Sequence, residues 1–275
     1  MAVVENVTSK TKGELRISEV SASRLAEVDF NDIPFGRIFA DHMLEIDCID
    51  GQWQAGCIKP YQNIMMSPAA MVLHYGQAIF EGMKAHHDAN TNDILLFRPE
   101  ENAKRLNKSA ARMSMPTIPV ELFMTYLKEL VNLDRAWVPN IEGTALYIRP
   151  FMFANDQFIG VKTSQNYKLI VFTCPVGAYY SKPVKVLIED YYVRAVPGGT
   201  GDAKAAGNYA ATLYPAKLAN EKGYDQILWT DGLTHTHIEE IGTMNVFLII
   251  NGKAYTPKLD GTILPGITRD SIMQL

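Results

Sequence analysis

The sequence is poor in cysteine and has no excess of basic residues. Its three cysteines, Cys48, Cys57 and Cys174, are widely spaced and form neither a CxxC metal knuckle nor a disulfide framework. This pattern favours three core thiols in a reduced, cytoplasmic protein. His235 and His237 lie in a predicted turn, and we interpret them as solvated rather than as metal ligands. The formal net charge of −4 provides no basic surface for nucleic acid or anionic lipid.

Long apolar runs are also missing. No run approaches the ~18 residues that a membrane-spanning helix needs, and residues 1–16, MAVVENVTSKTKGELR, lack the apolar segment of a signal peptide. We expect residues 1–30, which are polar with scattered apolar positions, to form a flexible or loosely docked lead-in. With 47% apolar and 20% charged residues, the composition is that of a globular protein large enough for two domains.

The periodicity of apolar residues predicts two mixed α+β halves. Strands are expected at 44–50, 144–153, 167–174, 184–190, 225–231 and 245–250, and helices at 99–113, 119–133, 209–222 and at the start of 265–275. The segment 175–183 contains two prolines and a glycine, which is typical of a linker. We therefore expect an N-terminal domain over 1–174 and a C-terminal domain over 184–275.

Residues 198–211, GGTGDAKAAGNYAA, surround Lys204 with glycine and alanine. The pattern fits neither the P-loop nor the dinucleotide fingerprint. Two interpretations remain, a solvated turn lysine and a lysine that forms a Schiff base. A Schiff-base lysine must lose its proton to act as a nucleophile, and small neighbours leave room for a flat cofactor ring beside the backbone.

A lysine that binds pyridoxal phosphate needs three further groups, and the sequence offers a candidate for each. Glu239 and Glu240, in IEEIGTMN, are candidates for the carboxylate that keeps the pyridine nitrogen protonated. Residues 264–270, LPGITRD, place a Pro-Gly turn at a helix start, where free N–H groups bind phosphate. Tyr209 is a candidate donor to the phenolic oxygen. The occurrence of all three in one chain favours the Schiff-base interpretation.

Together these segments resemble the branched-chain amino acid aminotransferases, which are fold-type IV pyridoxal-phosphate enzymes. The resemblance covers most of the chain and implies an α+β fold of two mixed α/β domains, with the cofactor held by the C-terminal one. The motifs that carry it are FADHML (39–44), HYGQAIFEGMKA (74–85), LFRPEENAKRL (96–106), LYIRP (146–150), CPVGAYY (174–180), GDAKAAGNYA (201–210), DQILW (225–229), EEIGTMN (239–245) and GTILPGITRDSI (261–272).

The resemblance also implies which residues bind the cofactor. Lys204 would form the Schiff base and carry the proton between Cα of the amino acid and C4′ of the cofactor. Glu240, rather than Glu239, would pair with the pyridine nitrogen, because the family's carboxylate directly precedes the apolar residue and Gly-Thr-Met-Asn. The remaining implied contacts are Tyr209 to the phenolic oxygen, Arg98 and the backbone N–H groups of Ile267 and Thr268 to the phosphate, and Thr243 to the ring edge.

The implied reaction is reversible transfer of the amino group of L-leucine, L-isoleucine or L-valine to 2-oxoglutarate, in a cytoplasmic homodimer. The substrate pocket would be lined by Tyr75, Phe80, Tyr147, Arg149 and Tyr179. Its aromatic walls suit a branched aliphatic side chain, and Tyr147 and Arg149 would contact a substrate carboxylate. From the residues alone, Arg98 is better explained as an exposed arginine at a helix start, and the aromatics as core residues.

The chain departs from the family pattern after its last motif. Family members continue for several dozen residues with a Gly-Thr-Ala type loop that adds a phosphate contact, so the C-terminal domain is incomplete by comparison. We expect a chain that ends at Leu275 to have weak or no transaminase activity and poor stability. The alternative functions are another fold-type IV enzyme, namely a D-amino acid transaminase or an aminodeoxychorismate lyase, and a non-catalytic remnant.

Overall fold

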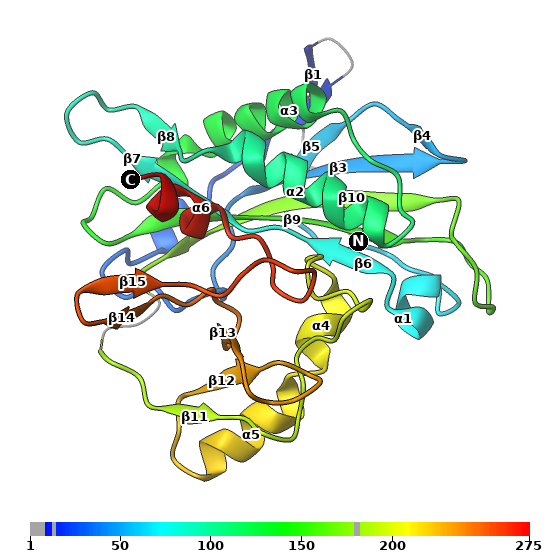
Figure 1. Cartoon of the computed structure of the whole chain (residues 1–275). Coiled ribbons are helices and arrows are strands. Elements are labelled where there is room, and N and C mark those ends of the chain that lie inside the picture. The colour runs from blue at the N-terminus through cyan, green and yellow to red at the C-terminus, as the bar shows by residue number, and fades with distance from the viewer. Residues whose placement is uncertain (1–8, 13–14, 179–181) are drawn as a thin grey trace. The chain divides into compact units, whose positions relative to one another are not determined.

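The computed structural model describes residues 9–12, 15–178 and 182–275. The chain divides into an N-terminal unit, Met1–Tyr179, and a C-terminal unit, Tyr180–Leu275 (Figure 1). The division falls within the segment 175–183, which the sequence predicts as a linker. Each unit has its own sheet and its own apolar core, and each is described by itself below.

In the described part of the N-terminal unit, ten strands form one sheet. Along the sheet the order is β1-β2-β5-β3-β10-β9-β7-β8, with β4 paired to β3 and β6 paired to β9. The strands are β1 (Ser9–Lys12), β2 (Leu15–Ser18), β3 (His42–Ile49), β4 (Gln52–Trp53), β5 (Cys57–Pro60), β6 (Ala78–Phe80), β7 (Met83–His87), β8 (Ile94–Leu96), β9 (Ala145–Ala154) and β10 (Tyr167–Val176). Neighbours are antiparallel except β2 and β5, which are parallel.

The two long strands β9 and β10 give the sheet two different faces. They pair along their whole length, from Tyr167 opposite Ala154 to Val176 opposite Ala145. Because side chains alternate along a strand, Ile148 lies in the main core, whereas Tyr147 packs in a separate cluster on the opposite face. The sequence predicts both strands, but β10 continues through Val176 and so includes the first residues of the predicted linker.

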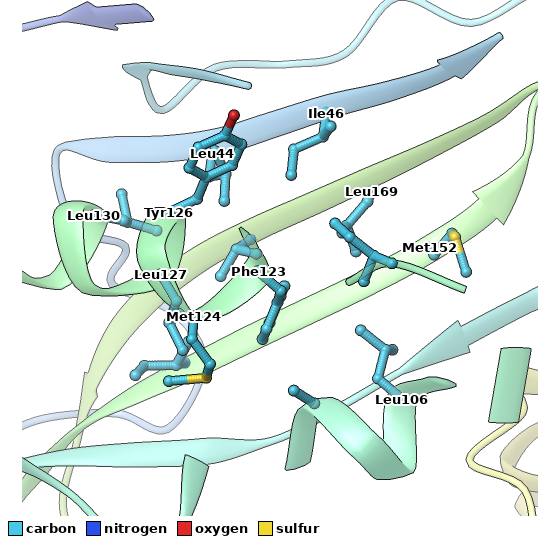
Figure 2. Close-up of a cluster of buried hydrophobic side chains, with 14 of the residues drawn as sticks. Leu44, Ile46, Leu106, Phe123, Met124, Tyr126, Leu127, Leu130, Met152 and Leu169 are labelled. Carbon is cyan, nitrogen blue, oxygen red and sulfur yellow. The ribbon is translucent and has the colours of Figure 1, made fainter. Parts of the chain in front are cut away.

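Two amphipathic helices cover one face of this sheet, α2 (Pro99–Arg112) and α3 (Val120–Leu133) (Figure 1). Pro99 fits the first helical turn because its missing N–H would have no partner there. Figure 2 shows the apolar side chains of α3, including Phe123 and Leu127, facing the buried side chains of the sheet. Each fully buried side chain of this size contributes ~1.5–3 kcal/mol. The shorter helices of this unit are η1 (Leu25–Glu27), α1 (Met71–Tyr75) and η2 (Arg135–Trp137).

The prediction of a loosely docked lead-in is wrong for the described residues after position 14. Strand β2 joins the sheet beside β5, and Leu15 is only 1% exposed within the main core. The backbone N–H of Val20 donates to Nε2 of His42, 3.0 Å away, while Nδ1 of that histidine lies 2.6 Å from Oδ1 of the buried Asp134. Strand β2 has only four residues, too few for a regular alternation of apolar positions to show, so this segment resembled a loop.

The C-terminal unit has a small sheet and a hairpin. Strands β11 (Val186–Ile188) and β12 (Gln226–Thr230) are parallel, β13 (Ile238–Ile241) is antiparallel to β12, and β14 (Leu248–Ile250) forms a hairpin with β15 (Lys253–Tyr255). The helices are α4 (Ala206–Ala210), α5 (Leu213–Glu221) and α6 (Ile267–Gln274). Ala219 of α5 packs on Ile227 and Trp229 of β12. In both units, none of the described helices combines the length and the apolar character that crossing a membrane requires.

Local sequence signals predicted part of this unit correctly. Asn251 and Gly252 both have positive φ, 52° and 74°, as expected for a two-residue hairpin turn. The single helix predicted over 209–222 is wrong, because the chain forms α4 and α5 with a break at residues 211–212. Pro215 explains the break, since a residue without a backbone N–H is accommodated in the first turn of a new helix but not in a helix interior.

Candidate active site

Lys204 lies in the loop directly before α4 of the C-terminal unit. Its Nζ donates a hydrogen bond to Oη of Tyr209, 2.9 Å away, and both side chains are half-buried. The loop must contain glycine at Gly201, because a Cβ there would lie 2.3 Å from the carbonyl oxygen of Thr262. The close approach of these two backbone segments therefore sets the position of the lysine.

The amide of Asn208 fixes the shape of this loop from within. Its Nδ2 donates to the carbonyl oxygens of Thr200, at 2.7 Å, and Ala203, at 2.9 Å. Its Oδ1 accepts from the Thr200 hydroxyl at 2.6 Å. Sequence reasoning placed Asn208 within a motif but gave it no function, since the available signal was just a polar residue among glycines and alanines.

Glu239 and Glu240 are neighbours on β13, so their side chains point to opposite faces of the strand. Glu240 lines a pocket together with Tyr209 and Thr243. Oε1 of Glu239 instead accepts a 2.6 Å hydrogen bond from the hydroxyl of Thr262. Burial raises the pKa of both carboxyl groups. The structure therefore places Glu240, and not Glu239, beside the tyrosine that Lys204 contacts.

Three groups surround the Glu240 carboxylate. Oε1 accepts from Nδ2 of Asn245 at 3.0 Å and from the backbone N–H of Leu264 at 3.2 Å. Oε2 lies 3.0 Å from Nε of Arg194 in an ion pair whose alignment falls outside hydrogen-bond geometry. Arg194 opposes the effect of burial on the pKa of Glu240 more than any other group does. Sequence reasoning assigned a function to neither Arg194 nor Asn245.

The start of α6 is tied to the same carboxylate. Gly266 precedes the helix, and a Cβ at this position would lie 1.9 Å from Oδ1 of Asn245. Nδ2 of Asn245 also donates to the carbonyl oxygen of Leu264, 2.9 Å away. The N–H groups of Ile267 and Thr268 belong to the first turn of α6, where backbone donors have no acceptor within the helix. This helix start can therefore offer hydrogen bonds to an anion.

The N-terminal unit brings together three of the residues predicted to bind substrate. Oη of Tyr147 accepts a hydrogen bond from Nη2 of Arg149 at 2.9 Å, and the guanidinium of Arg149 lies 4.7 Å from the ring centroid of Phe80. Gly82 leaves the space for the tyrosine, because a Cβ there would lie 2.2 Å from Oη. These side chains lie on the sheet face opposite to α2 and α3.

A buried ion pair supports the turn between β6 and β7. Glu81 is 0% exposed, and its two oxygens accept from Nε and Nη2 of Arg105 at 2.7 and 2.9 Å. Nδ2 of Asn102 donates to the same carboxylate at 2.8 Å. This network connects α2 to the residues on either side of Glu81, namely Phe80 and Gly82. Sequence reasoning missed it, because the partners lie in two different motifs.

Two other predicted site residues of this unit lie at the ends of its helices. Tyr75 is the last residue of α1, with its ring 6.1 Å from that of His74. Arg98 directly precedes α2, with a positive φ of 47°. Tyr179, the remaining residue predicted to line the pocket, lies outside the described residues.

In the C-terminal unit, the geometry provides an amine in contact with a phenol, a buried carboxylate at the adjoining pocket, and a helix start tied to that carboxylate. Such a set can bind an aldehyde through Lys204, a protonated ring nitrogen through Glu240, and an anion through the start of α6.

Comparison with known proteins gives family and fold. The model of the amino-transferase class IV family matches residues 78–275. The chain is 49% identical over 269 residues to branched-chain-amino-acid aminotransferase 2 of Bacillus subtilis, covering 96% of this chain and 74% of that protein. It is 50% identical over 252 residues to a probable branched-chain-amino-acid aminotransferase of Staphylococcus epidermidis, covering 90% of this chain and 70% of that protein.

Solved structures show the same fold. A branched-chain aminotransferase of Thermoproteus uzoniensis with norvaline has a TM-score of 0.69 at 23% identity, covering 85% of this chain and 74% of that one. A branched-chain amino acid aminotransferase of Thermobaculum terrenum in its PLP-form has a TM-score of 0.68 at 19% identity, covering 86% of this chain and 72% of that one.

Proposed function

Since the chain belongs to the aminotransferase class IV family, we propose that it transfers the amino group of L-leucine, L-isoleucine or L-valine to 2-oxoglutarate with pyridoxal phosphate as cofactor. The substrate class is supported by relatives about half identical to this chain that are named branched-chain-amino-acid aminotransferases. The observation that carries the proposal is the contact of Lys204 with Tyr209 at the pocket lined by the buried Glu240.

The residues present fit this cofactor. A primary amine for the aldehyde, a phenol for the ring oxygen and a carboxylate for the ring nitrogen all belong to the C-terminal unit. When bound, pyridoxal phosphate supplies the electron sink that stabilises negative charge at Cα of the amino acid. Lys204 would remove the proton from Cα, since it is an amine on a flexible side chain whose small neighbours leave it room to move.

The other cofactor contacts are proposals as well: those of Tyr209, Thr243, Ile267 and Thr268 rest on the C-terminal unit, and that of Arg98 rests on its sequence motif alone. Tyr209 would orient the cofactor ring by donating to its phenolic oxygen. Thr243, which lines the pocket, would contact the ring edge. The N–H groups of Ile267 and Thr268 would bind the phosphate at the start of α6, where the helix dipole favours an anion. Arg98 would add a charged donor to the phosphate.

Substrate binding is proposed for the aromatic residues of the N-terminal unit. Phe80 and Tyr147, together with Tyr75 and Tyr179, would form apolar walls for a branched side chain. Arg149 would bind the second carboxylate of glutamate or 2-oxoglutarate, because a guanidinium matches carboxylate geometry. The stacking of Arg149 on Phe80 and its bond to Tyr147 would hold the guanidinium in place.

We further propose that the two units are domains joined by the segment 175–183 and that the protein acts as a homodimer. Light scattering during size-exclusion chromatography would measure the mass. A particle with the mass of one chain at micromolar concentration would contradict the dimer.

The test of the function is a single half-reaction followed by absorption and product release. The purified protein is loaded with pyridoxal phosphate, and L-leucine is added without 2-oxoglutarate. The visible band of the lysine-linked cofactor should disappear, with release of one branched 2-oxo acid per site. Conversion of D-alanine but not L-leucine would indicate a different fold-type IV enzyme and contradict the proposed substrate.

The lysine is tested by reducing the cofactor link with borohydride and measuring the intact mass. Lys204→Ala should show no added mass, because Lys204 contacts Tyr209 of this pocket and none of the described residues that line the pocket carries a primary amine. The matched control is Lys217→Ala on α5, whose side chain is 71% exposed and should label like the wild type. Full labelling of Lys204→Ala would rule out this lysine as the attachment point.

A further inference from the structure

Arg194 connects three segments that surround the pocket of the C-terminal unit. Its Nε lies 3.0 Å from Oε2 of Glu240, with side chains that are 8% and 4% exposed. Its Nη2 donates to the carbonyl oxygen of Thr262 and, at 3.4 Å, to that of Gly201. One guanidinium thus joins the carboxylate to the loop of Lys204 and to the turn on which that loop packs.

The charge of Arg194 matters because Glu240 is almost fully buried. Burial alone raises the pKa of this carboxyl group, and among the opposing influences Arg194 comes first, ahead of the backbone N–H of Leu264 and of Lys204. The neighbouring Glu239 acts in the opposite direction. Tyr209, which also lines the pocket, carries no charge that could replace the arginine. An uncompensated buried carboxylate would bind a proton, and a protonated carboxyl cannot form a charge pair with a ring N–H⁺.

We propose that Arg194 is a positioning residue for the cofactor: its guanidinium keeps the Glu240 carboxylate ionised and oriented at the pocket, and couples that carboxylate to the Lys204 loop. This inference rests on the proposed function, because it assigns to Glu240 the ring nitrogen of pyridoxal phosphate. Arg194 also lines the pocket, and its side-chain contacts in the structure are with Glu240, Gly201 and Thr262. A merely structural arginine, which only ties the Gly201 and Thr262 backbones together, is the competing explanation.

A double-mutant cycle separates the two explanations. The dissociation constant of pyridoxamine 5′-phosphate, which contains the ring nitrogen but forms no link to Lys204, is measured by protein fluorescence in the wild type, Arg194→Met, Glu240→Gln and the double variant. If Arg194 acts through Glu240, its replacement should weaken binding about tenfold in the wild-type background, because the carboxylate loses the charge that keeps it ionised and oriented. In the Glu240→Gln background, the same replacement should change binding about twofold or less.

The pH dependence of binding provides a second readout. Because Arg194→Met raises the pKa of Glu240, the acid limb of the binding profile should move to higher pH, and Glu240→Gln should lack this limb. The ligand's own groups titrate alike with all variants. Their effect therefore cancels when the dissociation constant of a variant is divided by that of the wild type at the same pH. Arg194→Lys, which keeps a positive charge near the carboxylate, should therefore shift the acid limb less than Arg194→Met does. The double-mutant cycle is repeated with Arg194→Lys in place of Arg194→Met. Circular dichroism checks the fold of every variant.

The matched control is Glu239→Gln, on the same strand. In a cycle of Glu239→Gln with Arg194→Met, the effects of the two substitutions on binding should be additive. Equal losses on replacing Arg194 with and without Glu240, or an unshifted acid limb, would overturn the inference and leave the proposed function intact. A wild-type protein that does not bind pyridoxamine 5′-phosphate would instead overturn the proposed function, and the role of Arg194 with it.

Discussion

The opposite directions of Glu239 and Glu240 make a strong prediction about cofactor affinity. Replacing Glu240 by glutamine removes the charge that would pair with the ring nitrogen, and a hydrogen bond to a charged group contributes about 1.5–3 kcal/mol. The expected loss is therefore roughly 10- to 150-fold in affinity for pyridoxamine 5′-phosphate. Glu239→Gln should change this affinity by less than about threefold, because Glu239 contacts the hydroxyl of Thr262 and not the pocket.

Fluorescence titration of the two variants at about pH 7.5 measures both effects under one condition, where an ordinary carboxyl group is ionised. The substitutions are matched in size and position, so a general disturbance of β13 should lower both affinities alike. Glu239→Gln also tests the effect of this carboxyl group on the stability of the fold. Burial raises the pKa of Glu239, so its ionisation opposes folding as the pH rises. Glu239→Gln should therefore not lower the melting temperature at neutral pH. A larger loss of affinity in Glu239→Gln than in Glu240→Gln would refute this reasoning.

Three further predictions concern the N-terminal unit. Gly82→Ala places a Cβ 2.2 Å from Oη of Tyr147 and should cost about 1–3 kcal/mol in urea unfolding; an unchanged midpoint would contradict the close contact. Leu127→Ala removes a side chain that is 0% exposed and should cost about 2–5 kcal/mol; a loss below about 1 kcal/mol would contradict its place in the core. Burial raises the pKa of Cys174 to about 11, so at about pH 8 a thiol reagent should label the half-buried Cys57 before Cys174. Peptide mass spectrometry would measure the two labelling rates, and faster labelling of Cys174 would contradict its burial.

The elements that the sequence predicted well are those with a strong local signal. Helices expected at 99–113 and 119–133 match α2 and α3 within a residue or so, because an apolar stripe together with a proline near the start defines each of them. Strands β6, β7 and β8 contain only a few residues each and were not predicted, since so short a segment shows no periodicity. The family and the α+β fold class, which rested on long motifs in order, are confirmed by the comparisons.

In the C-terminal unit, the candidate site residues that sequence reasoning proposed have a local signature. Lys204 and Tyr209 share one small-residue stretch, and Glu240 adjoins a Gly-Thr turn. Arg194 and Asn245 were missed because their partners are remote in the chain: Arg194 meets a carboxylate on β13, and Asn245 meets the start of α6. Nothing in the neighbouring residues of either one indicates such a contact.

The sequence by itself determined the chemical groups of the site and the alternation that sends Glu239 and Glu240 to opposite faces of one strand. The residues alone left both glutamates as candidates, and the resemblance to a family favoured Glu240; the tertiary structure decided which face of the strand borders the pocket. That choice depends on Asn245, on Arg194 and on the packing of the Gly201 loop against another backbone segment. The contacts of Arg194 and of the Gly201 loop join residues far apart in sequence, and their energies depend on burial, which no local pattern specifies.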